Sequence, residues 1–142
     1  MTRILLNVAI PGEPCAQKRH RWARGRIFDP SFDDKKDFLW QLKAACPSLK
    51  PDLQARIGVR LKVWTSSWKI DADNFLKFYM DALSPWKSKE KRKKAQIAIQ
   101  TAQAFAIWGN DNQVDDVQVT VHRGGIEPRI EILVYEIQSD KV

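Results

Sequence analysis

Hydrophobic and polar residues alternate along three stretches of the chain. Apolar side chains recur at every second position in residues 4–10, 57–63 and 117–121. A period of two is typical of a β-strand with one buried face. Residues 129–137 follow the pair Gly124-Gly125, and this order predicts a hairpin turn and a last strand. The pattern therefore predicts four strands.

Two other stretches are predicted to be helices. Asp29-Pro30 is typical of a helix start, with Asp as the N-cap and Pro at the first helical position. Apolar residues from Phe32 to Cys46 give this helix one buried face. A second helix is predicted from Asn74 to Ser84, with Asp73 as its N-cap. These elements predict an α+β fold over residues 1–142, a single domain whose mixed β-sheet packs against helices.

Composition narrows the class of protein. A hydrophobic fraction of 44%, with six tryptophans in 142 residues, is typical of a folded globular chain rather than a disordered one. Cys15 and Cys46 have neither metal-ligand spacing nor a disulfide framework, so we interpret them as free thiols in a reducing compartment. The apolar run of residues 4–10 is too short to cross a membrane. We expect a soluble, cytoplasmic protein with no membrane partner.

Charge indicates a polyanionic partner. The net charge is +7, from 24 Lys and Arg against 17 Asp and Glu. Residues 17–26 contain five basic side chains, no acid and Trp22, a composition suited to phosphate contacts and base stacking. The sequence predicts a hairpin here, with Gly25 at its tip and residues 26–28 as the returning strand. A solvated, mobile basic loop is the alternative to a nucleic-acid contact. The candidate DNA-binding residues are Lys18, Arg19, Arg21, Arg24 and Arg26.

A second basic run lies within residues 84–108. Residues 87–94 carry six basic side chains and one acid, and the Ala- and Gln-rich sequence after them favours helix. A helix over most of this segment would be a further contact to the DNA backbone, a dimer-facing arm or a solvated charged helix end.

The densest polar motif lies in residues 70–83. On an extended segment Asp71 and Asp73 would project to the same side, because strand side chains alternate. On the helix that follows, Asn74, Lys77 and Asp81 form one polar stripe. Paired carboxylate oxygens suit Mg²⁺. The alternative is a capping and turn motif that needs no metal.

Further carboxylates follow the second basic run. Asp111 lies in the centre of a predicted turn over residues 109–114. Asp115 and Asp116 come directly before the strand that begins near Val117.

Three motifs together resemble the RusA-type Holliday junction resolvases, small endonucleases of bacteria and their phages or prophages. They are Pro14-x-x-x-Lys18-Arg19-x-Arg21, then Asp71-x-Asp73-Asn74-x-x-Lys77-x-x-x-Asp81-Ala82-Leu83, and then Asn110-Asp111-x-Gln113-Val114. Their order agrees with that family over most of the chain. The segment 84–108 departs from it, because it is longer than the connection in the best-known members.

The resemblance implies a Mg²⁺-dependent homodimer that nicks opposed strands of a four-way DNA junction, with Mn²⁺ as an alternative ion. It implies Asp71, Asp73 and Asp111 as metal ligands and Lys77 as an essential catalytic residue. Asn74 and Asp81 are then expected to orient the ligands or Lys77. Two alternatives stay open: a non-catalytic basic DNA-binding module, and a fork- or flap-specific nuclease that uses the same acidic site.

Overall fold

The computed structural model describes residues 3–19, 21–23, 26–28, 30–47, 54–84, 107–108, 111–124 and 127–137. Within these ranges the side chains of residues 21–23, 26–28 and 111 are not described. Most of the segment 84–108, with its predicted basic helix, therefore lies outside the described residues. Where its end is described, at Ile107 and Trp108, both side chains are buried and the backbone is not helical.

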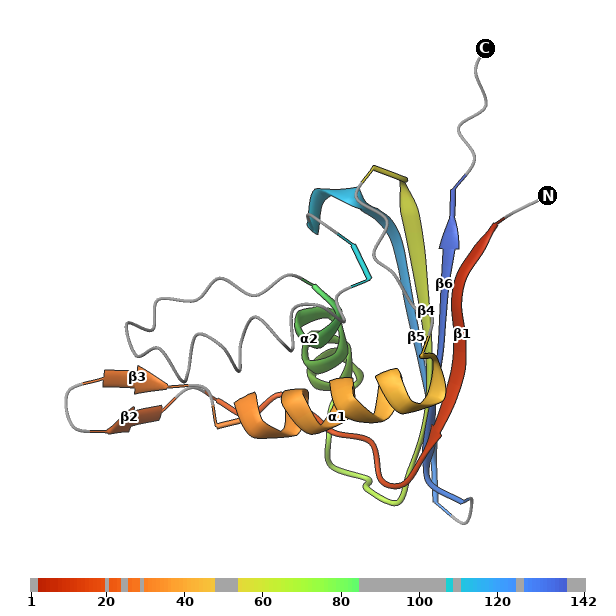
Figure 1. The fold of residues 1–142 in the computed structure, drawn as a ribbon. Helices are drawn as coiled ribbons and strands as arrows, with labels where there is room; N and C mark the ends of the chain where they lie inside the picture. The colour runs from red at the N-terminus through yellow and green to blue at the C-terminus, as the bar shows by residue number, and fades with distance from the viewer. Residues whose placement is uncertain are drawn as a thin grey trace.

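One mixed sheet forms the centre of the fold (Figure 1). Its strands lie in the order β1-β6-β4-β5. Strands β4 and β5 are parallel, whereas β6 is antiparallel to both β4 and β1. The strands are β1 (Ile4–Pro11), β4 (Ile57–Thr65), β5 (Val114–Arg123) and β6 (Arg129–Glu136). The predicted α+β fold with a mixed sheet is confirmed.

The predicted hairpin between the last two strands is wrong, because β4 lies between β5 and β6. Helix α2 lies in the chain between β4 and β5, and parallel strands require a crossover of this kind. Strand β6 then pairs with the other side of β4, where Val59 and Leu61 lie opposite Val134 and Ile132. The turn after β5 does contain a glycine in the left-handed region, Gly124, at φ +71°.

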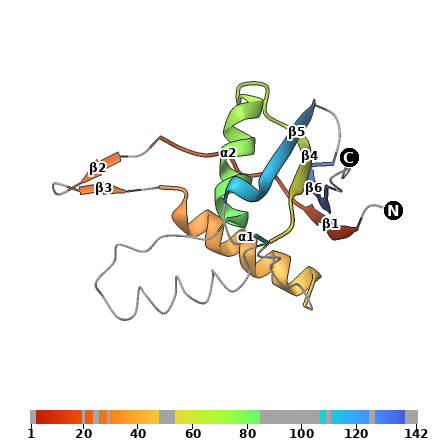
Figure 2. The same ribbon diagram turned by 90° about the horizontal axis from the view of Figure 1, so that it is seen from above.

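Helices α1 (Phe32–Ala45) and α2 (Ala72–Leu83) cover the same face of the sheet (Figures 1 and 2). Helix α1 contacts β1, and α2 contacts β5. Between the helices, the Phe38 ring meets the Tyr79 ring edge to face at 4.9 Å. The buried face of β4 completes this core with Ile57, Val59, Leu61 and Val63.

The start of α1 differs from the prediction. Ser31 is the N-cap and Pro30 lies in a turn, while Asp29 is outside the described residues. Ser31 is fully buried, and its hydroxyl accepts a hydrogen bond from the Lys18 N–H at 3.0 Å. The predicted helix start at Asp29-Pro30 is therefore wrong. The hydrogen bond between Lys18 and Ser31 is a tertiary contact, which a local Asp-Pro pattern does not reveal.

At the edges of the sheet, the alternating sequence pattern predicted more burial of apolar residues than the structure shows. Ile4 is 57% exposed and Val117 is 38% exposed. Ile4 lies next to an irregularity in the β1–β6 register, and Val117 lies on the edge strand β5. An edge strand has a neighbour on one side only, so its apolar residues are covered less completely.

A small hairpin extends away from the sheet (Figures 1 and 2). It consists of β2 (Arg21–Ala23) and β3 (Arg26–Phe28), and Arg21 pairs with Phe28. The predicted hairpin in the basic stretch is confirmed, although Gly25 at its tip lies outside the described residues. Among the described helices, none is long and apolar enough to cross a membrane.

Candidate active-site groove

Helix α2 begins earlier than predicted. The N-cap is Asp71, in an extended conformation, and the first helical residue is Ala72. Asp73 therefore lies in the first turn of the helix, and its prediction as the N-cap is wrong. Asp71 and Asp73 therefore do not lie on one extended segment, and the prediction that they project to the same side of a strand is wrong. Acidic side chains in a first turn interact favourably with the helix dipole, which is consistent with the earlier start.

The polar stripe of α2 faces one open groove. Asp71, Asn74, Lys77 and Asp81 line a hollow of about 610 Å³. Its remaining lining residues are Gln17, Lys18 and Arg19, from the segment that follows β1. Carboxylates, an amide and basic side chains thus meet across one groove, although the two segments lie more than fifty residues apart in the chain.

Three hydrogen bonds hold the basic segment against the helices. The N–H of Gln17 donates to the carbonyl oxygen of Asn74 at 3.0 Å. The N–H of Cys15 donates to the hydroxyl of Tyr79, also at 3.0 Å. With the bond from Lys18 to Ser31, these contacts fix the backbone that carries Lys18 and Arg19 into the groove. Sequence reasoning missed Ser31 and Tyr79, and periodicity carries no signal for such long-range hydrogen bonds.

Asp73 and Lys77 form an ion pair on the surface of α2. Lys77 Nζ lies 3.0 Å from Asp73 Oδ2, and the side chains are 60% and 66% exposed. An exposed pair of this kind contributes roughly 0–1 kcal/mol. Either group can therefore exchange its partner for an incoming phosphate or cation at little cost in stability.

Asp81 is tied to α1 by a buried lysine. Lys35 is 5% exposed, and its Nζ lies 3.5 Å from Asp81 Oδ2 and 6.0 Å from the centre of the Phe78 ring. A buried ammonium requires a partner, so this pair explains why a carboxylate occurs on a mainly apolar helix. Sequence reasoning missed Lys35. Its signal was its position three residues after Phe32 and three before Phe38, on the apolar face of α1.

The other predicted DNA contacts are only partly described. Arg21 lies in β2 and Arg26 in β3, where the backbone alone is described. Arg24 lies outside the described residues. Of the five basic candidates, Lys18 and Arg19 are the two whose side chains the structure places at the groove.

Asp111 begins a short 3₁₀ helix, η1 (Asp111–Gln113), which leads directly into β5. Val114 pairs with Ile57, so η1 lies at the end of the sheet where β4 begins. Asp71 instead follows the opposite end of β4. Among the described side chains, no three His, Cys, Asp or Glu residues are grouped so that they could hold a metal ion. The structure thus brings Asp71 into the groove with Lys77, but its described part does not place Asp111 beside them.

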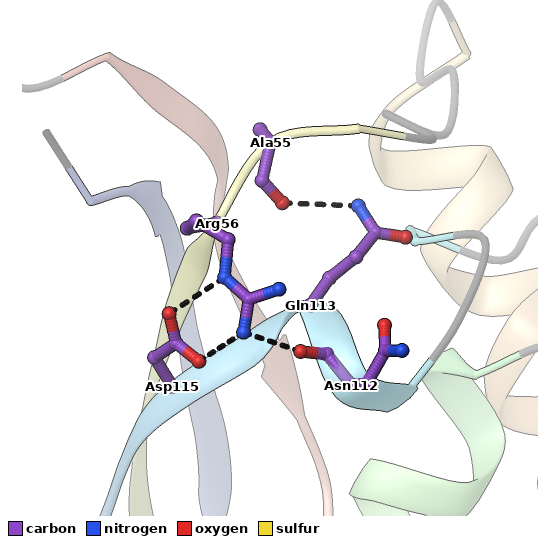
Figure 3. Close-up of polar contacts among 5 residues, drawn as sticks. All are labelled: Ala55, Arg56, Asn112, Gln113 and Asp115. Atoms are coloured by element: carbon purple, nitrogen blue, oxygen red, sulfur yellow. Dashed lines mark hydrogen bonds and ion pairs between the residues drawn. The ribbon is translucent and has the colours of Figure 1, made fainter. Parts of the chain in front are cut away.

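An arginine fixes the backbone around η1 (Figure 3). Arg56 Nε donates to Asp115 Oδ2 at 2.7 Å, and its Nη2 donates to the other carboxylate oxygen and to the carbonyl of Asn112. Gln113 Nε2 donates to the carbonyl oxygen of Ala55 at 3.0 Å. The hydrogen bonds from Arg56 lower the pKa of the Asp115 carboxyl. These contacts join η1 to the start of β4.

Asp115 and Asp116, the two acids near Asp111, both have protein partners. Asp115 binds Arg56, and Asp116 Oδ2 accepts a hydrogen bond from the Tyr135 hydroxyl at 2.6 Å. That bond raises the pKa of Tyr135. The Tyr135 ring crosses β4 at Gly58, where a Cβ atom would lie 2.2 Å from it. Both carboxylates therefore already bind side chains from the neighbouring part of the sheet.

Comparison with known proteins adds no relative. No protein-family model matches the chain, and no curated protein matches it. The function is therefore inferred from the groove and the residues that line it.

Proposed function

We propose that the protein is a Mg²⁺-dependent, structure-specific endodeoxyribonuclease that resolves four-way DNA junctions by paired nicks. The observation that supports it is the groove in which Asp71 and Lys77 on α2 face Lys18 and Arg19. Basic side chains on one side suit a phosphate backbone. Carboxylates on the other suit the cation that phosphodiester hydrolysis commonly uses.

The acidic residues of α2 are chemically suited to Mg²⁺. This ion prefers oxygen ligands, keeps several water molecules and often binds through only one or two carboxylates. Asp71 and Asp73 are both exposed at the start of α2 and supply such oxygens. The resemblance implies Asp111 as a third ligand, but η1 lies at the other end of β4, so the proposal rests on Asp71 and Asp73 and does not depend on Asp111. A bound Mg²⁺ would activate water and neutralise charge on the scissile phosphate.

Lys77 is the residue proposed to contact the reacting phosphate. Its ammonium already forms a charged pair with Asp73, and it lines the groove. An ammonium at this place would stabilise the negative charge that develops on the departing oxygen. Asn74 and Asp81 flank Lys77 along the same stripe, and Asp81 is held in turn by Lys35. Their proposed role is to keep Lys77 and the carboxylates oriented.

Lys18 and Arg19 are proposed to bind the DNA backbone. Replacing Arg19 with alanine should reduce junction affinity and flatten the dependence of log K on log salt by about one, because one phosphate contact is lost. Fluorescence anisotropy over a series of salt concentrations measures the slope. The matched control is Lys62→Ala, which removes one charge from β4 outside the residues that line the groove. Equal slopes for wild type and Arg19→Ala would remove Arg19 from the interface.

A homodimer is part of the proposal. A four-way junction presents two equivalent strands for cutting, and a two-fold symmetric dimer would present two equivalent grooves. Paired symmetric nicks are the expected product of such an arrangement.

Cleavage of a synthetic four-way junction tests the proposal. The assay compares Mg²⁺ with EDTA and uses fork and linear duplex DNA as controls. Symmetric nicks that need both the junction and the metal are expected. If forks are cut as fast as junctions, the protein is a nuclease without junction specificity, and the fork- or flap-specific alternative is favoured. Tight junction binding without cutting in any divalent metal would instead identify a DNA-binding module and refute the enzyme.

A further inference from the structure

Arg123, the last residue of β5, reaches across to the loop that leads into the groove. Its Nη1 donates to the carbonyl oxygen of Ser67 at 2.9 Å, and its Nη2 donates to that of Ile70 at 2.6 Å. Ile70 directly precedes Asp71, the N-cap of α2. The guanidinium therefore holds the peptide unit from which Asp71 enters the groove.

The first half of this loop is fixed by other contacts. The N–H of Gly124 donates to the carbonyl oxygen of Thr65 at 3.1 Å. The Glu13 carboxylate accepts hydrogen bonds from the hydroxyl of Thr65 and from the N–H of Ser66, the latter at 3.1 Å. These contacts hold residues 65 and 66, at the end of β4. The bonds from Arg123 act further along, at Ser67 and Ile70, so they have the more direct influence on Asp71.

From these contacts we infer that Arg123 is a positioning residue for the metal site, because it sets the position of Asp71. The inference rests on the proposed function, which makes Asp71 a metal ligand. Residues that orient metal ligands without touching the ion typically contribute ten- to a hundredfold to metal affinity.

The chemistry of the contact favours arginine in particular. Two carbonyl oxygens, three residues apart in the loop, are both bound by one planar group with donors in a fixed fork. A lysine ammonium is a single point of charge on a flexible stem, and it does not reproduce this fork. The positive charge itself does not help, since a cation near the site would weaken Mg²⁺ binding by Coulomb repulsion. If Arg123 is replaced by a neutral residue, the loss of the fork should weaken metal binding, whereas the loss of positive charge should strengthen it.

The test measures Mn²⁺ binding to DNA-free protein by calorimetry, with Arg123→Gln, Arg123→Lys and the control Arg3→Gln. Arg3 directly precedes β1 and forms a surface ion pair with Glu136 at 2.7 Å, and neither residue lines the groove. Arg123→Gln is expected to weaken Mn²⁺ binding by about tenfold or more, despite the removal of a positive charge. Arg123→Lys should fall between Arg123→Gln and wild type, and Arg3→Gln should bind as wild type does.

Thermal unfolding without metal separates positioning from a general structural role. Weaker Mn²⁺ binding by variants that unfold within a few degrees of wild type supports the inference. Unchanged or tighter binding by Arg123→Gln would overturn it, as would the failure of wild type to bind Mn²⁺. The proposed function is judged separately in the junction assay. If the protein binds Mn²⁺ in an Arg123-dependent manner but cuts no DNA, the inference about Arg123 stands and the proposed nuclease function is refuted.

Discussion

Replacing Asp73 with asparagine is expected to abolish metal-dependent junction cleavage while leaving junction binding largely intact. Asparagine has nearly the same size but lacks the charge that holds a divalent cation. Residues that only orient ligands already contribute ten- to a hundredfold to metal affinity, so loss of a ligand should reduce the cleavage rate by at least about a hundredfold. The measurement is the single-turnover rate on a four-way junction, beside the dissociation constant in Ca²⁺ or EDTA.

The fold should tolerate this change. Asp73 is 66% exposed and its one described ion pair, with Lys77, is a surface pair. Its loss should alter the free energy of unfolding by no more than about 1 kcal/mol. The matched control is Asp33→Asn, because Asp33 is also an exposed acid in the first turn of a helix and pairs with Lys36 at 3.7 Å. Asp33→Asn should cut at the wild-type rate.

Two outcomes would count against the role of Asp73. Retained cleavage by Asp73→Asn would remove the carboxylate from the metal site. Joint loss of folding and binding would show instead that Asp73 is a structural residue at the start of α2. The second outcome would favour the alternative in which the acidic motif stabilises the start of α2 and needs no metal.

Replacing Phe38 with alanine is expected to have the largest effect on stability. Phe38 is 4% exposed, and its ring meets those of Phe78 and Tyr79 between α1 and α2. Truncating a buried phenylalanine costs about 3–5 kcal/mol. Since whole domains are stable by only about 5–15 kcal/mol, this is a large share of the total. Chemical denaturation followed by tryptophan fluorescence measures the change.

The functional consequence of Phe38→Ala should differ from that of Asp73→Asn. Helix α1 carries Ser31, which binds the backbone of Lys18, and Lys35, which binds Asp81. Displacing α1 would disturb both sides of the groove, so DNA binding and cleavage should fall together as the protein unfolds. The control is Trp40→Ala on the same helix, where the side chain is 53% exposed and the cost should stay below about 1 kcal/mol. Equal costs for the two variants would show that Phe38 does not anchor α1.

The local pattern of the sequence predicted most of the secondary structure. The strands at residues 4–10 and 57–63 were recognisable because alternation reflects burial on one face of a sheet. The second helix was recognisable from its apolar residues, but its start was placed two residues late. Cap signals are local, and here both helix starts differ from the Asp residues that the sequence favoured.

The candidate site could be predicted only in part. The stripe of Asn74, Lys77 and Asp81 follows from helical spacing alone, and the structure shows it facing one groove. The basic segment could be predicted as a polyanion contact, but its position across from that stripe could not. It depends on hydrogen bonds from Gln17 and Lys18 to residues far away in the chain.

The sequence by itself determined the chemistry available to this protein: a carboxylate-rich helix start, a basic segment and strands with one apolar face. Only the tertiary structure decided which of these groups meet. It placed β4 between β5 and β6, buried Lys35 against Asp81, and joined Arg123 to the loop before Asp71. The physical reason is that periodicity records which face of an element is buried, whereas partners across the fold depend on how all the elements pack together.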